Sequence, residues 1–238
     1  MNSELPRPTA GIDRSFYKEH PKTCAPDDYW GQVRRTVDGR PVPPEQIAMI
    51  VRQVLVGLEL GPDDVLLDLC CGNGALTTSF FERCAGGLGV DFSPPLLEVA
   101  ASRFVRRPSE AFVLDDVVTF TRSCARPERF TVALCYGAFS FLTTAEAEQV
   151  LAALHGRFIG VRRILLGNLP DRARIHDFFG PRYRPGTEDD PGSALGVWRT
   201  EEQLHDLATR CGWRARILRM PPEFYAAHYR YDAVLTRP

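Results

Sequence analysis

The fold is decided by the stretch Val65-Leu66-Leu67-Asp68-Leu69-Cys70-Cys71-Gly72-Asn73-Gly74. Its first five residues form an apolar run broken only by Asp68, a pattern typical of a parallel strand buried on both faces. A Gly-x-Gly turn follows and leads into a predicted helix. In an open α/β sheet the ligand crevice lies outside the carboxyl ends of the strands, and glycine lets the backbone approach a ligand closely. The stretch therefore predicts a ligand-binding turn.

The acidic residue in this stretch argues against a dinucleotide ligand. A dinucleotide enzyme places a pyrophosphate on the helix N-terminus, where a carboxylate at Asp68 would repel it. A ligand that carries an ammonium and a sulfonium would instead be attracted. The full G-x-G-x-x-G pattern is also absent, because Cys70 stands where a first glycine is expected.

Apolar runs and helical patterns alternate along the rest of the chain, which predicts an α/β fold with a doubly wound, mostly parallel sheet. The last two of its seven predicted strands are separated by a loop too short for a helical crossover, so the last strand is expected to be antiparallel. Capping boxes at 143–146 and 200–203 predict two helix starts. The expected strands cover 65–69, 87–91, 111–114, 130–136, 164–168, 213–218 and 231–236, and the expected helices cover 44–60, 72–83, 94–104 and 200–212, with another opening at 143.

Acidic residues also follow the second and third strands. A carboxylate at Asp91 can accept both hydroxyls of a ribose, although a turn or N-cap is the structural alternative there. Asp115 and Asp116 follow the third strand, where a carboxylate can accept a hydrogen bond from an adenine amino group. The Val117 backbone N–H can reach a ring nitrogen. The order of these positions favours ribose binding at Asp91.

With these motifs, the chain from about Pro43 to Pro238 resembles the class I S-adenosylmethionine (SAM)-dependent methyltransferase superfamily, in its small-molecule type. There an apolar strand ends in D-x-G-x-G-x-G-like turns. The resemblance implies a Rossmann-like methyltransferase fold, SAM as cofactor and S-adenosylhomocysteine (SAH) as product. It implies that Gly72 and Gly74 line the methionine part, that Asp91 holds the ribose and that Asp116 contacts adenine. The full expected cofactor set is Asp68, Cys70, Gly72, Gly74, Asp91, Phe92, Asp115, Asp116, Val117 and Cys135.

The chain departs from the family pattern at two places, and a third position argues against the nucleic-acid subclasses. Cys70 replaces the first glycine with another small residue, and Thr131 stands at a usually structural position where Asp often begins the fourth strand. Nucleic-acid amino-methyltransferases carry an N/D-P-P-Y turn after that strand, where this chain has Cys135-Tyr136-Gly137-Ala138. The similar-looking Asn168-Leu169-Pro170-Asp171 follows the fifth strand and is interpreted as a turn.

Two segments are expected to bound the substrate. Residues 1–42 are expected to cap the substrate cleft of a SAM-binding domain at 43–238, and 170–199 form an insertion expected to be a substrate loop. Both are rich in aromatic residues and arginine, whose guanidinium suits bidentate binding of carboxylate or phosphate. A solvated arginine-rich surface is the alternative. The expected substrate-binding residues are Tyr17, Trp30, Arg34, Arg172, Arg174 and Tyr183.

Methyl transfer from a sulfonium depends more on alignment and exclusion of water than on acid–base groups. A hydroxyl acceptor would still benefit from a general base, and histidine is the usual choice near neutral pH. His176, in the expected substrate loop, is the candidate base. Tyr29 and Tyr136 are candidates for orienting the acceptor.

Composition excludes several other functions. The net charge of -1 provides no basic field for nucleic acid. Seven cysteines show no metal-ligand spacing, and no signal core or membrane-length apolar run occurs, so a cytoplasmic protein without metal or membrane partner is expected. A homodimer stays open.

The expected function is methyl transfer from SAM to an oxygen or nitrogen of a small molecule, such as an anionic or sugar-like metabolite of secondary metabolism. Aminopropyl transfer needs an acidic polyamine site, which the arginine-rich segments do not provide. A non-catalytic SAM-binding regulatory or partner protein, and a protein or tRNA methyltransferase, remain open alternatives.

Overall fold

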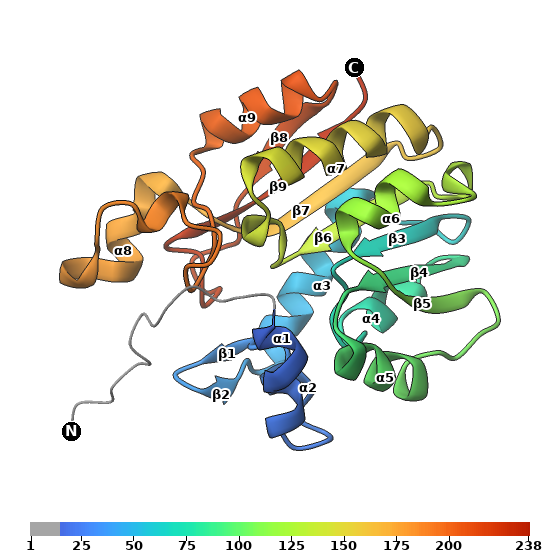
Figure 1. Ribbon diagram of the computed structural model, residues 1–238, viewed down its shortest axis with the longest axis horizontal. Coiled ribbons are helices and arrows are strands. Elements are labelled where there is room, and N and C mark those ends of the chain that lie inside the picture. The colour runs from blue at the N-terminus through green and yellow to red at the C-terminus, as the bar shows by residue number, and fades with distance from the viewer. Residues whose placement is uncertain (1–14) are drawn as a thin grey trace.

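The computed structural model describes residues 15–238 and has one central sheet with helices on both faces (Figure 1). The strand order is β5-β4-β3-β6-β7-β9-β8. The strands from β5 to β7 are parallel, and β9 runs antiparallel to both β7 and β8, which confirms the predicted sheet. The strands are β3 (Val65–Leu69), β4 (Gly86–Asp91), β5 (Glu110–Leu114), β6 (Val132–Tyr136), β7 (Arg163–Pro170), β8 (Arg214–Leu218) and β9 (Arg230–Thr236).

The apolar side chains of β3 pack into two hydrophobic clusters, one on each face of the sheet. Leu66 packs into the cluster that contains residues of α3 and α4, whereas Leu67 and Leu69 pack into the cluster that contains residues of α6, α7 and α9. This alternation follows from the period-two geometry of a strand. In Figure 1, α5 lies beside α4. The helices are α3 (Pro44–Leu58), α4 (Thr77–Phe81), α5 (Pro94–Arg103), α6 (Val117–Ser123), α7 (Thr144–Arg157) and α9 (Glu201–Arg210).

Helix starts were predicted better than helix extents. Both capping boxes form, with Thr143 and Thr200 accepting from the N3 backbone N–H of α7 and α9. The helix predicted from residue 72 begins only at Thr77, because Gly72 and Gly74 have φ of +60° and +78°, outside the helical region. Helix α6 was not predicted.

Two further segments lie outside this regular pattern. The N-terminal one contains α1 (Phe16–Glu19), η1 (His20–Thr23), α2 (Tyr29–Gln32) and the hairpin β1 (Thr36–Val37) and β2 (Arg40–Pro41). The second segment, predicted as an insertion at 170–199, is built of short helices, and a bridge between Asp171 and Arg199 joins its two ends. Its helices are η4 (Arg172–Arg174), α8 (Ile175–Phe179), η5 (Gly180–Arg182) and η6 (Thr187–Asp189). Of the N-terminal cap predicted at 1–42, residues 1–14 lie outside the described part of the chain.

At the end of the sheet away from the glycine turn, polar contacts link β3 to the segment before β6. Thr131 Oγ1 accepts a hydrogen bond from the Val65 backbone N–H at 3.0 Å and donates one to Asp64 at 2.6 Å. Thr131 therefore links the start of β3 to the segment before β6, a structural role for this departure from the family pattern.

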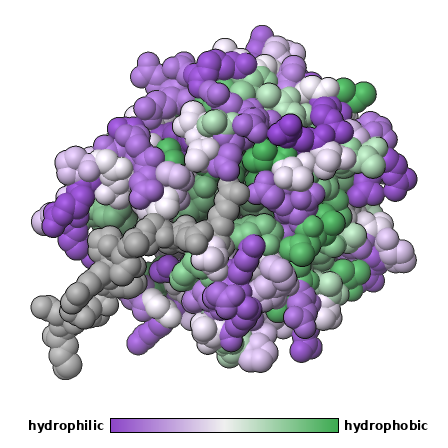
Figure 2. Space-filling view, viewed as in Figure 1, coloured by the Kyte–Doolittle hydropathy of each residue, from purple (hydrophilic) through white to green (hydrophobic). Residues whose placement is uncertain are grey.

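The surface is mainly polar. Figure 2 shows hydrophilic side chains over most of one face, with hydrophobic residues toward its middle. Among residues 15–238, no helix combines the length and the apolarity needed to cross a lipid bilayer. The same residues bring together no group of three or more His, Cys, Asp or Glu side chains suited to a metal ion.

Close packing between β3 and β4 predicts a strong effect of a single methyl group. A Cβ at Gly87 would overlap the Leu66 carbonyl oxygen and lie 2.7 Å from Phe81 Cε1. We expect Gly87→Ala to lower the free energy of unfolding by about 1–3 kcal/mol, measured by urea denaturation. Gly156 in α7 has no such neighbour, so Gly156→Ala should raise the free energy of unfolding by about 0.5–1 kcal/mol. Equal midpoints for the wild type and Gly87→Ala would contradict this packing.

Candidate functional site

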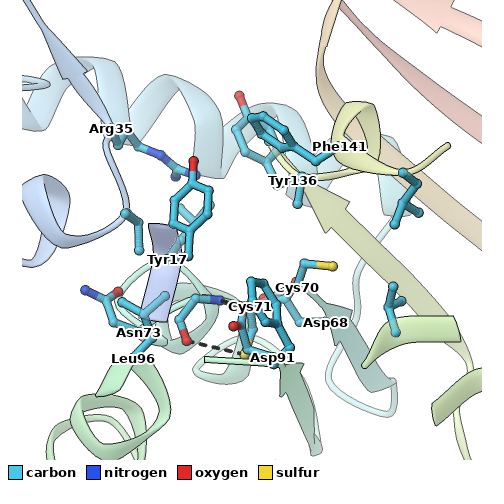
Figure 3. A pocket seen from close by; sticks show the side chains of 18 of the residues that line it. Tyr17, Arg35, Asp68, Cys70, Cys71, Asn73, Asp91, Leu96, Tyr136 and Phe141 are labelled. Carbon is cyan, nitrogen blue, oxygen red and sulfur yellow. Dashed lines mark hydrogen bonds between the residues drawn. The ribbon is translucent and has the colours of Figure 1, made fainter. Parts of the chain in front are cut away.

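One large cavity opens at the carboxyl ends of the central strands, where the sequence predicts the ligand site. Its volume is about 1130 Å³, including the space at its open mouth. Figure 3 shows Asp68, Cys70, Cys71 and Asp91 in one part of it, with Tyr17, Arg35 and Tyr136 in another. The described residues that line it are Tyr17, Trp30, Val33, Arg35, Asp68, Cys70, Cys71, Gly72, Asn73, Leu76, Asp91, Phe92, Leu96, Asp116, Val117, Tyr136, Gly137, Ala138, Phe141, Leu142 and Pro191.

The turn after β3 is left-handed at several positions. Cys70, Gly72 and Gly74 have φ of +58°, +60° and +78°. A side chain at Gly72 is further restricted, because a Cβ there would lie 2.9 Å from Val33 Cγ1. Cys70 occupies the position of the family's first glycine, and its positive φ is a conformation that glycine adopts without strain.

The Asp91 carboxylate holds the ends of β3 and β4 together. It accepts hydrogen bonds from the Gly72 N–H at 2.8 Å and from the Ser93 N–H at 2.9 Å, one on each oxygen. Burial raises its pKa, and the two N–H groups oppose that shift. Each carboxylate oxygen can accept more than one hydrogen bond, so Asp91 keeps acceptor capacity toward the cavity that it lines.

Asp68 is a second buried carboxyl group in the same cavity. It is only 4% exposed, and its one hydrogen bond comes from the Thr77 hydroxyl at 2.6 Å. Burial raises its pKa to about 7, the negative charge of Asp91 adds to this, and Arg35 and the Thr77 hydroxyl oppose it. A cationic group bound near Asp68 would stabilise its ionised form.

The other part of the cavity is aromatic. The Arg35 guanidinium lies 5.7 Å from the ring centroid of Trp30 and 5.2 Å from that of Tyr136, distances typical of cation–π contacts. Tyr17 and Phe141 meet edge to face at 6.2 Å. Burial raises the pKa of the Tyr136 hydroxyl well above its usual range, so this group stays protonated at neutral pH.

The N-terminal segment is bound to the glycine turn by polar contacts. Asn73 Nδ2 donates to the Tyr29 carbonyl at 2.8 Å and to Gln32 Oε1 at 2.9 Å. The Ser93 hydroxyl donates to the Tyr17 carbonyl at 2.6 Å. These bonds join residues 17–32 to the turns after β3 and β4, and so they bring Tyr17 and Trp30 to the cavity.

Most of the predicted cofactor residues line the cavity, together with some of the residues predicted to bind the substrate or to act in catalysis. Three predicted cofactor residues do not line it. Gly74 packs against Phe112, Cys135 is buried beneath the turn with its thiol against Cys70, and the Asp115 N–H donates to the Asp91 carbonyl at 3.0 Å. The predicted residues that line it are Asp68, Cys70, Gly72, Asp91, Phe92, Asp116 and Val117 for the cofactor, Tyr17 and Trp30 for the substrate, and Tyr136 for catalysis.

The structure does not bring the predicted base, His176, to the cavity. His176 is exposed on α8, and its ring contacts that of Tyr183 with centroids 4.8 Å apart. The ring of Tyr29 turns to Phe104, at 5.0 Å. Neither tyrosine lines the cavity: Tyr183 packs against His176 within the insertion, whereas Tyr29 packs against Phe104 at the end of α5.

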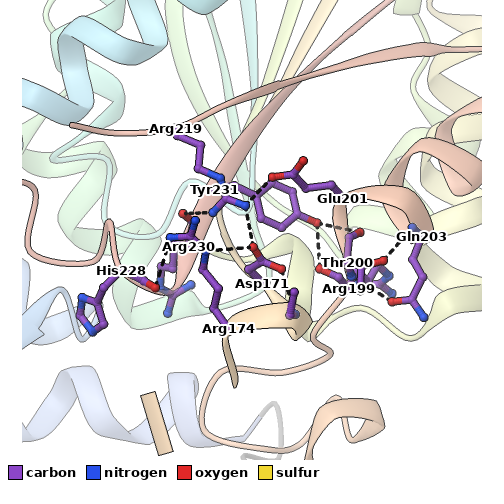
Figure 4. A network of polar contacts seen from close by, with 11 residues as sticks. Asp171, Arg174, Arg199, Thr200, Glu201, Gln203, Arg219, His228, Arg230 and Tyr231 are labelled. Atoms are coloured by element: carbon purple, nitrogen blue, oxygen red, sulfur yellow. Dashed lines mark hydrogen bonds and ion pairs between the residues drawn. The ribbon is translucent and has the colours of Figure 1, made fainter. Parts of the chain in front are cut away.

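The predicted anion-binding arginines also lie elsewhere. Arg172 pairs with Asp189 at 2.6 Å and with Glu188 at 3.3 Å. Arg174 lies 3.6 Å from Asp171 in the network of Figure 4. Arg34 is exposed, with its guanidinium 5.3 Å from the ring centroid of Phe16. Acidic neighbours therefore occupy the guanidinium groups of Arg172 and Arg174, and Arg34 does not line the cavity.

The sequence placed both Arg34 and Arg35 in the segment expected to bound the substrate, but Arg34 was the one predicted to bind it, whereas Arg35 is the one of the two that lines the cavity. Sequence reasoning also missed Asn73, although Asn73 lies within the quoted glycine turn. The available signal was weak: Arg34 and Arg35 are adjacent in the sequence, and the contacts of Arg35 with Trp30 and Tyr136 appear only in the tertiary structure.

Comparison with known sequences finds a methyltransferase match. Residues 66–157 match the family described as a methyltransferase domain. A stretch of 75 residues is 31% identical to an uncharacterized methyltransferase of Schizosaccharomyces pombe, over 32% of this chain and 27% of that protein. The chain thus spans about a quarter of the length of the curated relative that it matches.

Solved structures share the fold. The chain is similar to magnesium protoporphyrin IX methyltransferase (ChlM) from Synechocystis PCC 6803 with bound SAH, with a TM-score of 0.64, 16% identity, and coverage of 94% of this chain and 98% of that one. It is also similar to DhpI in a complex with SAM and HEP, with a TM-score of 0.65, 14% identity, and coverage of 94% and 95%. At these identities the likeness shows the fold.

The raised pKa of Asp68 predicts a pH-dependent stability. The folded protein holds a proton on Asp68 that the unfolded chain releases above about pH 4, so the stability falls as pH rises from about 4 to about 7. Asp232, whose pKa burial raises to about 6, adds to this slope. We expect Asp68→Asn to be more stable than the wild type at pH 8 by on the order of 2–4 kcal/mol, and nearly equal at pH 4.

The measurement is urea denaturation across this pH range. Asp63→Asn, at an exposed neighbouring position, serves as control and should leave the wild-type slope unchanged. An Asp68→Asn profile parallel to the wild type would show that this carboxyl group is not desolvated.

Proposed function

We propose that this chain belongs to the class I SAM-dependent methyltransferase superfamily, which the methyltransferase-domain match and the shared fold support, and that it transfers the methyl group of SAM to an oxygen or nitrogen of a small-molecule acceptor. The observation that carries the proposal is one continuous cavity. It joins the acidic turns after β3 and β4 to the aromatic walls formed by Tyr17, Trp30 and Tyr136. A cofactor and an acceptor can therefore meet in a single enclosed space.

The cofactor part of the cavity fits SAM by the chemistry of its carboxylate acceptors. Asp91 would accept the ribose hydroxyls, and the buried Asp68 has the charge that an ammonium group requires when it is ionised. Gly72 and the left-handed turn around it bring backbone close to the cavity without a side chain. Asp116, which caps α6 through the N–H groups of Val118 and Thr119, lines the cavity where adenine is expected.

Methyl transfer requires the acceptor atom to be aligned with the methyl group of the cofactor. Bound SAM would supply an electrophilic methyl group on a positively charged sulfur; the sulfur would keep the electron pair of the C–S bond as SAH leaves, and the acceptor's O–H or N–H proton would be released to solvent. The chain's residues hold the acceptor in line and exclude water. None of the described residues that line the cavity is a histidine. The protonated Tyr136 hydroxyl serves as a hydrogen-bond donor that orients the acceptor.

The N-terminal segment supports a small acceptor over a protein or tRNA. Tyr17, Trp30, Val33 and Arg35 line the cavity, and their segment is bound to the turns after β3 and β4. A macromolecular acceptor would need this segment to move away. Metabolites of secondary metabolism are one source of acceptors of this size.

Calorimetry with SAM and SAH tests the cofactor site. We expect micromolar binding by the wild type and a loss of about 30- to 1,000-fold in Asp91→Ala, because a charged hydrogen-bond pair to the ribose is removed. Glu98→Gln, at an exposed position on the neighbouring helix α5, should bind like the wild type. Equal affinities for Asp91→Ala and the wild type would exclude Asp91 from the ribose site.

Catalysis is tested separately with methyl-labelled SAM and a mixture of small metabolites. Label transferred to a metabolite supports the enzyme. Tight binding of SAM with no transfer to any acceptor would favour a non-catalytic SAM-binding partner, and transfer only to protein or tRNA would overturn the small-molecule proposal.

A further inference from the structure

Unpartnered polar groups gather beside the aromatic part of the cavity. Among residues 15–238, buried side-chain atoms without a hydrogen-bond partner include Arg35 Nη1, the Tyr136 hydroxyl and Asn168 Oδ1. A buried polar group without a hydrogen-bond partner is unfavourable, and such groups are rare in native proteins. Several of them together point to a missing polar ligand.

Arg35 is the cation of this group. It lies between the rings of Trp30 and Tyr136, which fix its guanidinium without using its N–H donors. No carboxylate of the described residues is within ion-pair distance of it, whereas Arg172 and Arg219 both have such partners. A guanidinium fork held in this way presents two parallel donors, the geometry that a carboxylate accepts.

Two donors converge on the open side of Gly137. The position of a Cβ on Gly137 lies 3.7 Å from Arg35 Nη2 and 3.5 Å from Asn168 Nδ2. Gly137 has φ of +80° and lines the cavity directly after Tyr136, which is only 6% exposed. The guanidinium, the amide and the phenol therefore surround one small space at the end of β6.

The charges around this space favour a single negative charge. Arg230 lies behind it, with a hydrogen bond from Nη1 to the Asn168 carbonyl and its guanidinium 4.9 Å from the Tyr229 ring centroid. Asp232 accepts a hydrogen bond from the Asn168 N–H at 2.6 Å, and Asp68 lies near enough for the charge of Arg35 to lower its pKa. Because burial still raises the pKa of Asp68 to about 7, its negative charge offsets that of Arg35 only in part.

We propose that Arg35, assisted by Asn168 and Tyr136, binds the carboxylate of the methyl acceptor, so that the substrate is a small carboxylic acid methylated at another oxygen or at a nitrogen. This rests on the proposed methyltransferase function. A carboxylate bound to a guanidinium is a poor nucleophile, because the hydrogen bonds stabilise its charge. The clamp therefore orients the acceptor, and a different group of the same molecule takes the methyl.

The test uses the SAH-loaded protein and matched pairs of ligands. Hydroxy- and amino-substituted benzoates are titrated beside their neutral benzamides, which have the same ring but no charge. We expect at least one benzoate to bind about tenfold or more tightly than its amide. Arg35→Gln should remove that preference while leaving SAH affinity and the affinity for the amide within a few-fold of the wild type.

Arg34→Gln is the matched control, since Arg34 is adjacent but exposed, and it should keep the preference for benzoate. Asn168→Asp adds a negative charge to the clamp and should weaken benzoate binding without weakening the amide. Equal binding of acids and amides, or no binding of either to protein that binds SAH, would overturn the clamp. So would an Arg35→Gln variant that loses SAH and amide equally, since the residue would then only shape the cavity. Failure of the wild type to bind SAH would instead refute the proposed function.

Discussion

The site depends on two carboxyl groups that are buried at neighbouring strand ends. Parallel pairing of β3 with β4 puts Asp68 and Asp91 at the same edge of the sheet, where each is about 95% buried. Their charges repel, and burial raises both pKa values. Backbone N–H groups stabilise Asp91, but Asp68 has only the Thr77 hydroxyl. A cationic ligand bound at this point would stabilise the ionised form of Asp68.

Hydrogen bonds connect the glycine turn to the N-terminal segment, which forms part of the aromatic wall of the cavity. Asn73, inside the glycine turn, donates to Tyr29 and Gln32 and so holds the N-terminal segment over the strand ends. Arg35 follows in that segment and stacks on Tyr136 from β6. Cofactor and acceptor regions are thus parts of one structure, in which the backbone of the glycine turn is linked to the walls of the acceptor space.

The insertion between β7 and α9 behaves differently from the N-terminal segment. Its arginines pair with nearby acids, and Asp171 at its base is bound by Arg219 at 2.6 Å. Of residues 170–199, only Pro191 lines the cavity. An arginine-rich segment is therefore a poor guide to an anion site, because an arginine that already has an acidic neighbour is unavailable to a ligand. Arg35 differs in having aromatic neighbours instead.

The sequence by itself determined the sheet, the glycine turn and the order of its acidic residues. These follow from local rules: a buried strand needs the apolar run in β3, a left-handed turn favours Gly72 and Gly74, and Thr143 and Thr200 cap the helices that follow them. Only the tertiary structure decided which arginine faces the cavity and that His176 does not. Those outcomes depend on contacts between segments far apart in the chain, such as Arg35 with Tyr136, which no spacing of residues encodes.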